Sequence, residues 1–444
     1  MVGMSVWGWY SSVRKVSDLG ALKHCSALIV ATVVLSCCVA TSSAAAETVY
    51  STIATVTANH PSISSVRKLQ RSADEDLTEA RSGYFPVITL DGKIGTTKVD
   101  QLTGNGGTHT SEIAGGVSVP LYDGMRTRNL TRAAKASQDV AAFEVINQQV
   151  KVAFEAAQVF IDVQRTRELE TVSRANVGRV NDLSRKLAER AKSDPGLRSE
   201  ITLGAASVME AEIEDNIASQ DAVLAADLFL QLVGRKPNAL AQVNLKSLAL
   251  PSSMEQVLQT VTLDHPSVRS ANSEAEKELA KAEADRSRLH PNIDLVGQIR
   301  AGENLDGNIG RDNSSFVGLK MSFKFSTGGG EIAHARSSTL RAEASKDQVL
   351  EAQLRVRKQV LTVWSEWQVA NKNYQTIVKR KRNSDEMMRA YEGQFAAGER
   401  KLLEFFFVLK EQNEARKAEV NARYDRILAG FKLLAAMGRM PASG

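Results

Sequence analysis

The octapeptide TVTANHPS at residues 55–62 returns as TVTLDHPS at residues 260–267, with six of the eight positions identical. The two blocks lie 205 residues apart, and the match continues without a gap from Pro86 to Pro291. Further along, at an offset of 204, Gly234 returns as Gly438. A match of this length indicates an internal tandem repeat, in which one structural unit occurs twice.

Each copy is predicted to begin with two helices that meet at a His-Pro pair, followed by two strands. Apolar and polar residues alternate along these strands, which gives each strand one apolar and one polar face. The segments 101–110 and 302–315 are rich in Gly, Asn and Asp, and we expect solvated loops there. The apolar strand positions are Ile88, Leu90, Ile94, Ile113, Val117, Val119, Leu121, Ile293, Leu295, Ile299, Val317, Leu319, Met321, Phe323 and Phe325.

Long helices follow the strands in both copies. Residues 125–192 contain no proline, and a helix of this length would reach about 100 Å at about 1.5 Å per residue. Its apolar residues are spaced as in a coiled coil, at Ala136, Val140, Phe143, Val150, Phe154, Ala157 and Ile161. A similar stripe in the last helix comprises Val420, Tyr424, Ile427, Phe431 and Leu434. The expected division is a first repeat at 47–250 (hairpin about 86–123, long helices about 125–233) and a second at 251–444 (hairpin about 291–327, long helices about 331–437).

Residues 1–46 are predicted to be a secretory signal peptide. Basic residues precede the apolar run at 27–40, which is too short to span a bilayer, and Ala44-Ala45-Ala46 offers a cleavage site before Glu47. Two alternatives remain open, namely an uncleaved anchor and a lipoprotein acylated at Cys37. The mature chain is therefore expected in an exported compartment of a Gram-negative bacterium.

The composition excludes several classes of function. The 444 residues carry a net charge of only +5, without a basic block interleaved with aromatics, so nucleic-acid binding has little support. No cysteine follows Cys38, which excludes thiol catalysis and Cys-ligated metals in the mature chain. No pair of histidines has metal-ligand spacing, and His60, His265 and His290 each precede a proline, where a structural role is expected. We expect no enzyme activity, no metal and no cofactor.

Four strands with one apolar face cannot form a stable isolated sheet. In an exported chain, strands from several subunits can close into a barrel whose apolar face meets lipid and which has no free edge. The long helices would then project from the barrel. The predicted fold class is α+β, with a membrane β-barrel contributed by four strands per subunit and continuous with an α-barrel of long helices.

At this point the sequence resembles the TolC-like outer-membrane export channels over almost the whole mature chain. The resemblance implies a homotrimer, in which three subunits with four strands each form a 12-stranded barrel above an α-barrel of 12 helices that extends into the periplasm. It is carried by the two His-Pro blocks, Tyr84-Phe85-Pro86, the segment 119–124 (VPLYDG), the segment 232–237 (LVGRKP), the segment 394–404 (QFAAGERKLLE) and the segment 434–440 (LAAMGRM).

The resemblance also implies a gate at the periplasmic tip of the helices. By motif match, Gly398 is the turn glycine, Arg400 the arginine that follows it, and Glu404 an acidic gate residue. Phe395 stands where the family commonly has a tyrosine, and Phe407 stands where the best-known members have a second acidic residue. The hypothesis is that Arg400 and Glu404 pair between helices and hold the tip shut. The alternative is that both are solvated helix charges.

The implied partners are a periplasmic adaptor, an inner-membrane transporter of the ABC or RND type, and outer-membrane lipid. The expected function is a passive export duct, and the C-terminal segment favours type I protein secretion. The alternative within the family is a multidrug efflux duct, and a secreted coiled-coil structural protein is the rival from another class.

Overall fold

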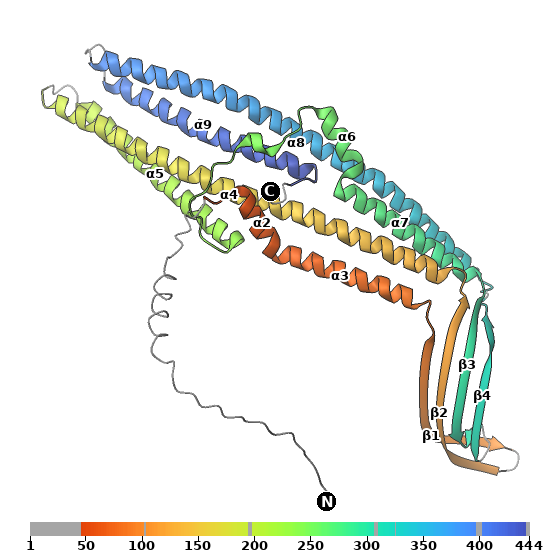
Figure 1. Ribbon diagram of the computed structural model, residues 1–444. Coiled ribbons are helices and arrows are strands. Elements are labelled where there is room, and N and C mark those ends of the chain that lie inside the picture. The colour runs from red at the N-terminus through yellow and green to blue at the C-terminus, as the bar shows by residue number, and fades with distance from the viewer. Residues whose placement is uncertain are drawn as a thin grey trace, which may run out of the picture. The chain divides into compact units, whose positions relative to one another are not determined.

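The computed structural model describes residues 46–101, 104–193, 198–305, 310–324, 326–396 and 402–440. The predicted signal peptide lies outside these residues except for Ala46. The elements belong to one compact unit, Glu47–Gly444, in which two helices, two strands and two long helices follow one another twice (Figure 1). Among the described residues, none of the helices combines the length and the apolar character needed to cross a membrane.

The His-Pro pairs are helix starts. Helix α2 (Val49–Asn59) ends at His60, which is also the N-cap of α3 (Pro61–Ser82) and accepts a hydrogen bond from the Ser62 N–H. His265 performs the same role between α6 (Met254–Asp264) and α7 (Pro266–Arg286). Proline suits the first helical position because its missing N–H would have no partner there. The predicted structural role of these two histidines is confirmed.

The strands form one antiparallel sheet in the order β1-β2-β3-β4. Strands β1 (Val87–Gln101) and β2 (Gly104–Tyr122) are longer than β3 (Asn292–Glu303) and β4 (Arg311–Ser322). The expectation of loops at 101–110 and 302–315 was therefore wrong in extent. In the first hairpin, backbone pairing begins with Val87 opposite Ser118 and continues to Gln101 opposite Gly104. The hydrogen bonds of the ladder join backbone groups, so they do not require apolar and polar side chains to alternate.

The register collects the apolar side chains on one face. Ile88 lies opposite Val117, and Leu295 lies opposite both Val119 and Leu319. This face is uncovered in the single chain, where Ile94 is 91% and Val317 is 80% exposed. The other face is polar. Its Glu112 carboxylate lies 2.8 Å from Arg300 Nε and 3.8 Å from Lys93 Nζ.

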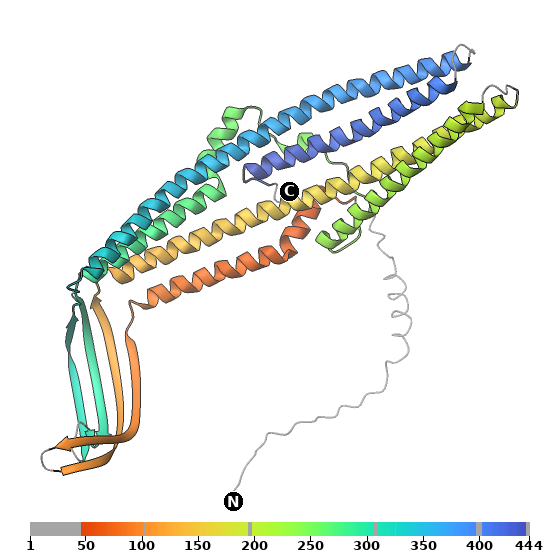
Figure 2. The same cartoon turned by 180° about the vertical axis from the view of Figure 1, so that it is seen from behind.

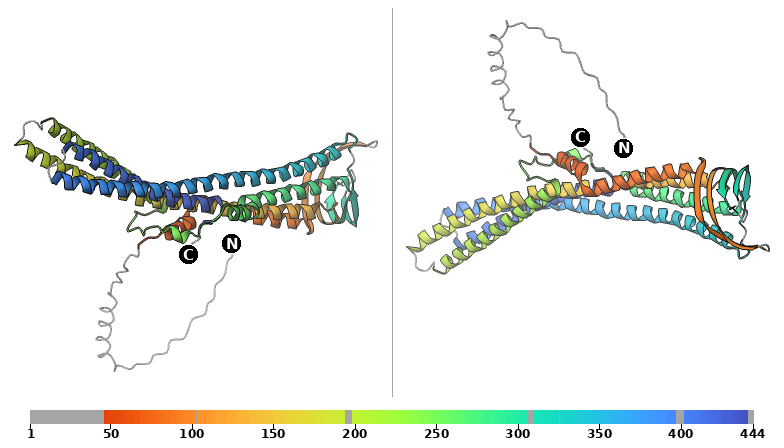
Figure 3. Two further views of the ribbon diagram at one scale, coloured as in Figure 1. Left: turned by 90° about the horizontal axis from the view of Figure 1, so that it is seen from above. Right: turned by 90° about the horizontal axis from the view of Figure 1, so that it is seen from below.

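The four long helices are arranged as two hairpins. Helix α4 (Arg126–Ala191) packs against α5 (Arg198–Val233), and α8 (Gly330–Ala396) packs against α9 (Leu402–Ala436), while α9 also contacts α4 (Figure 2). The sheet lies at the end where the strands join α3, α4, α7 and α8, and the C-terminal ends of α4 and α8 lie at the other end (Figure 3).

The two predicted helical stripes had different outcomes. All five residues of the α9 stripe are buried, so that prediction is confirmed. In α4 only Ala136, Ala157 and Ile161 are buried, whereas Val140, Phe143, Val150 and Phe154 are half-buried. The reason is that α4 contacts α2, α3, α5, α7 and α9 at different heights, so its buried face changes along its length.

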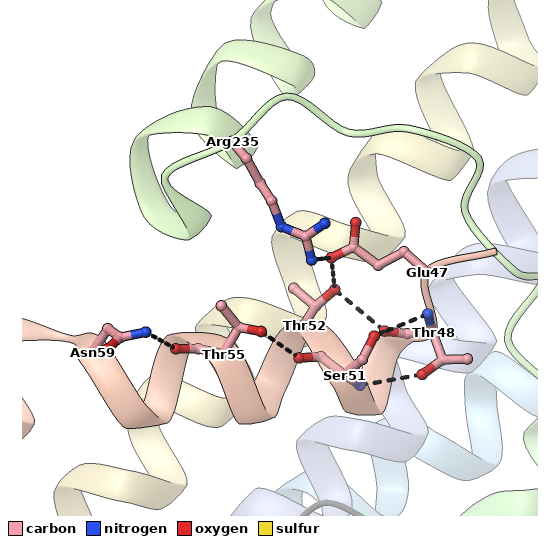
Figure 4. Close-up of polar contacts among 7 residues, drawn as sticks. All are labelled: Glu47, Thr48, Ser51, Thr52, Thr55, Asn59 and Arg235. Carbon is pink, nitrogen blue, oxygen red and sulfur yellow. Dashed lines mark hydrogen bonds and ion pairs between the residues drawn. The ribbon is translucent and has the colours of Figure 1, made fainter. Parts of the chain in front are cut away.

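Glu47 ties the start of the described chain to the segment 235–250 that joins the two halves. Its carboxylate, only 6% exposed, accepts a hydrogen bond from Arg235 Nη2 at 2.6 Å and one from Thr52 Oγ1 at 2.8 Å (Figure 4). The Glu47 backbone also exchanges hydrogen bonds with Ala239 and Ala241. Together with the capping box of Thr48 and Ser51, these bonds fix the joining segment beside α2.

Candidate functional site

The predicted gate residues fall at the α8–α9 turn. Phe395 lies in the last turn of α8, and Glu404 lies half-buried in the first turn of α9. Gly398 and Arg400 lie outside the described residues. The proposed pairing of Arg400 with Glu404 therefore stays a prediction.

Phe395 connects the two helix hairpins at their tips. The Arg190 guanidinium of α4 lies over its ring, 4.1 Å from the centroid, and the Phe405 ring of α9 packs against it with centroids 5.6 Å apart. A cation over an aromatic face contributes about 0.5–1 kcal/mol at an exposed site, and a tilted aromatic pair contributes a similar amount. The arginine at the end of α4 and the aromatic residues of α8 and α9 thus hold the tips together.

These contacts belong to an apolar cluster, which we name the tip core. The sequence reasoning missed Arg190, Phe405 and Phe406, although the run Phe405-Phe406-Phe407 at the start of the last helix was a visible signal. Phe406 is buried, whereas Phe407 points outward and is 65% exposed. The buried members of the tip core are Val180, Leu183, Leu187, Ala211, Met388, Phe406, Val408 and Leu409.

A polar network lies beside the tip core. Arg179 of α4 donates to Gln412 of α9 at 2.7 Å, and Gln412 donates to Asp385 of α8 at 2.8 Å. Asp385 also accepts from Lys381 at 3.1 Å and from Arg416 at 3.3 Å. Burial alone would raise the pKa of Asp385, but hydrogen bonds from Lys381 and Gln412 and the nearby cations outweigh it and lower that pKa. A cleft of about 760 Å³ lies beside this network and is lined by Arg179, Asp385, Gln412, Arg416, Phe395 and Phe405.

Ion pairs join the hairpins farther from the tip. Lys410 of α9 lies 2.6 Å from Glu210 of α5, and Lys417 lies 3.1 Å from Glu214. Nearer the sheet, Glu168 of α4 accepts hydrogen bonds from Arg423 and from the Tyr424 hydroxyl. Burial and the acceptor Glu168 raise the pKa of Tyr424, so the hydroxyl remains a donor. No group of metal-binding side chains occurs among the described residues. The contacts here are hydrogen bonds and ion pairs between helices.

A family profile described as outer membrane efflux protein matches residues 52–222 and 257–439, which together make up most of the chain. The chain belongs to the outer membrane efflux protein family. Each matched segment contains one strand pair and one hairpin of long helices. The first segment ends at residue 222, before the end of α5 at Val233. The protein is thus an outer-membrane efflux channel with long helices in the periplasm, and the resemblance found in the sequence is confirmed.

Individual relatives agree with this assignment. Over 432 residues, covering 95% of this chain and 92% of the relative, the sequence is 26% identical to the outer membrane efflux protein BepC of Brucella suis. The outer-membrane channel CmeC of Campylobacter jejuni shares the fold with a TM-score of 0.77 at 12% identity, covering 88% of this chain and 85% of CmeC. The channel MtrE of Neisseria gonorrhoeae gives a TM-score of 0.75 at 17% identity, covering 88% and 89%. These solved structures are channels, not enzymes.

The Asp385 network of this efflux protein predicts acid sensitivity. Because the folded-state pKa of Asp385 lies below its unfolded value, its stabilising contribution is complete above about pH 4 and is lost as the pH falls through the folded pKa. We expect Asp385→Asn to lower the free energy of unfolding by about 1 kcal/mol at pH 7 and to flatten its decline below pH 4. Thermal unfolding of the purified protein between pH 3 and pH 7 measures this. Asp347→Asn, at an exposed position of the same helix, is the control, and an equal response of both variants would contradict the prediction.

Proposed function

We propose that this efflux protein is the outer-membrane duct of a tripartite export system and that it serves type I protein secretion. It conducts cargo passively from an inner-membrane ABC or RND transporter through a periplasmic adaptor to the exterior. The observation that carries the proposal is the four-stranded sheet, which has an uncovered apolar face, a polar face and two unpaired edges. Only closure with other copies in lipid satisfies all three features.

The preference for protein secretion rests on the C-terminal segment, which resembles members that serve type I secretion more than it resembles the lipid-anchored multidrug members, whose acylated cysteine is missing. A multidrug efflux duct is the second candidate, because BepC is named an efflux protein. We further propose that residues 1–46 are removed as a signal peptide and that 47–250 and 251–444 are two copies of one unit.

The repeat predicts how copies join in a homotrimer. Within the chain, β2 of the first copy pairs with β3 of the second, so that Gly115 lies opposite Ile299. At the repeat offset of 204, Gly115 of the first copy corresponds to Leu319 of the second copy, and at the offset of 205, Ile299 corresponds to Ile94. Leu319 lies on β4 and Ile94 lies on β1, and these are the two edge strands. Leu319 should therefore lie opposite Ile94 of the next copy, and both side chains belong to the apolar face. This pairing closes the barrel without an edge.

A cross-linking experiment tests this closure. The double variant Ile94→Cys/Leu319→Cys should form a covalent trimer ladder in isolated outer membranes, because Cβ atoms of directly opposite residues lie about 5 Å apart. The matched control Leu90→Cys/Leu319→Cys moves one cysteine four residues along β1, about 13 Å away, and should not cross-link. Equal cross-linking of both variants, or none in the first, would contradict the register.

The gate proposal places Phe395, Gly398, Arg400 and Glu404 at the closing point of the duct. The contacts of Phe395 with Arg190 and Phe405 support it, since they join the two hairpins at their tips. We expect Glu404→Gln or Arg400→Gln to raise the single-channel conductance in planar bilayers severalfold, because either change removes the proposed pair. Glu386→Gln, an exposed charge on α8, is the control. Unchanged conductance in both gate variants would contradict the pairing.

The cargo class is tested by deleting the gene and comparing the secreted proteome with drug susceptibility. Loss of one large secreted protein without drug sensitisation is expected for type I secretion. Sensitisation to several drugs with an unchanged secreted proteome would instead identify a multidrug duct. Complementation with the native gene should restore the lost phenotype.

A further inference from the structure

The carboxylate of Glu47 is buried but incompletely paired. Its side chain is 6% exposed, and Oε1 accepts the hydrogen bonds from Arg235 Nη2 at 2.6 Å and from Thr52 Oγ1 at 2.8 Å (Figure 4). The other oxygen, Oε2, is buried and has no hydrogen-bond partner among the described residues. An unpaired oxygen on a buried carboxylate is unfavourable, because it has lost water without gaining a donor. The site therefore lacks one hydrogen-bond donor.

The second repeat has a serine at the position equivalent to Glu47. Thr48 is the N-cap of α2, and Ser253, 205 residues later, is the N-cap of α6. The residue before the cap is Glu47 in the first repeat and the exposed Ser252 in the second. The buried carboxylate thus belongs to the copy whose start becomes a chain terminus when residues 1–46 are removed.

The backbone nitrogen of Glu47 faces an acceptor that α4 holds in place. Its N–H donates to Ala239 O at 2.8 Å. Arg167 of α4 donates to the two carbonyl groups at 237–238, and Gln164 of α4 donates at 2.7 Å to the carbonyl group two residues after Ala239. Because the joining segment is held on both sides of Ala239, this carbonyl group stays directed at the Glu47 nitrogen.

Removal of residues 1–46 would change the chemistry of this nitrogen. Before the cut it is an amide with one N–H, which Ala239 already uses. Hydrolysis of the peptide bond between Ala46 and Glu47 consumes one water molecule and leaves a carboxylate on Ala46 and an ammonium group on Glu47. The ammonium group is charged at pH 7 and has three N–H donors. Its hydrogen bond to Ala239 becomes charge-assisted, and further donors become available.

We propose that the amino group released at Glu47 is the missing donor and that it completes the attachment of the joining segment 235–250 to α2. This inference rests on the proposed removal of residues 1–46 as a signal peptide. The ammonium group belongs to the same residue as the unpaired Oε2, and it adds a second positive charge to that of Arg235.

The surroundings of the nitrogen can accept this charge. Ala46 is exposed, so its departure leaves the ammonium group next to water and keeps the desolvation cost low. The N-terminus of α2 acts as about half a positive charge, which is smaller than the full negative charge of the Glu47 carboxylate. The balance of charge therefore favours an ammonium group at this position.

The consequence is an order of events during export. While residues 1–46 are attached, the buried carboxylate is incompletely paired and the joining segment is held less firmly. The cut supplies the additional charge. The two repeats are then fully fastened to each other only in the exported chain, after its release from the signal peptide.

A double-mutant comparison tests the role of the amino group. Insertion of one glycine between Ala46 and Glu47 leaves the cut in place but returns the Glu47 nitrogen to an amide. Hydrogen exchange of the protein purified from outer membranes should become about tenfold faster in peptides covering 235–245, where the Ala241 N–H donates to the Glu47 carbonyl group. The same insertion in the Glu47→Ser background should change this exchange little. Peptides covering 251–264, the equivalent part of the second repeat, are the internal control and should not change.

Mass spectrometry provides the second readout. The mature chain should begin at Glu47, and its terminal amine should react with an acetylating reagent about tenfold more slowly than the amine of the inserted glycine. Equal exchange with and without the glycine, in a chain that begins at Glu47, would overturn the role of the amino group and leave signal removal standing. A mature mass that includes residues before Glu47 would overturn both. Single-channel conductance, which tests the duct itself, should be the same for the native chain and the glycine variant.

Discussion

The uncovered apolar face of the sheet is the constraint on which the rest of the structure depends. A sheet that exposes Ile94 and Val317 almost completely, with free edges at β1 and β4, is unstable as an isolated element in water. Lipid on the apolar face and neighbouring strands at both edges remove these costs together. The polar face, with Glu112 held by Arg300 and Lys93, then surrounds an aqueous lumen. Membership of an outer-membrane channel family agrees with this physical requirement.

The helices meet a different requirement, because they must hold their packing over a long distance. Midway along their length they pack through a large apolar cluster, and Glu47 and Arg235 fasten the joining segment there (Figure 1). Towards the tips the packing ends in a smaller core that contains Phe406 and Leu409. Contacts at the very end are cation–π and aromatic, as at Arg190, Phe395 and Phe405. The proposed gate thus lies where cation–π and aromatic contacts join the two hairpins.

The candidate site was only partly predictable. A sequence motif placed Phe395 and Glu404 on either side of a helix boundary, and local sequence is enough to determine such a boundary. It did not reveal that Arg190, more than 200 residues earlier in the chain, lies over the Phe395 ring. A single arginine among many on a long helix carries no distinguishing signal. The Arg179–Gln412–Asp385 network was missed for the same reason, since its members lie on three different helices.

The sequence by itself determined the elements that local chemistry specifies: helix starts at the His-Pro pairs, alternating strands, long proline-free helices and the resemblance to a channel family. These depend on patterns over a few residues or on a repeat that can be read directly. Only the tertiary structure decided how far the strands extend, which face of α4 is buried at each height, and which polar residues meet inside the bundle. Such features depend on the register between segments distant in sequence, and no local pattern encodes that register.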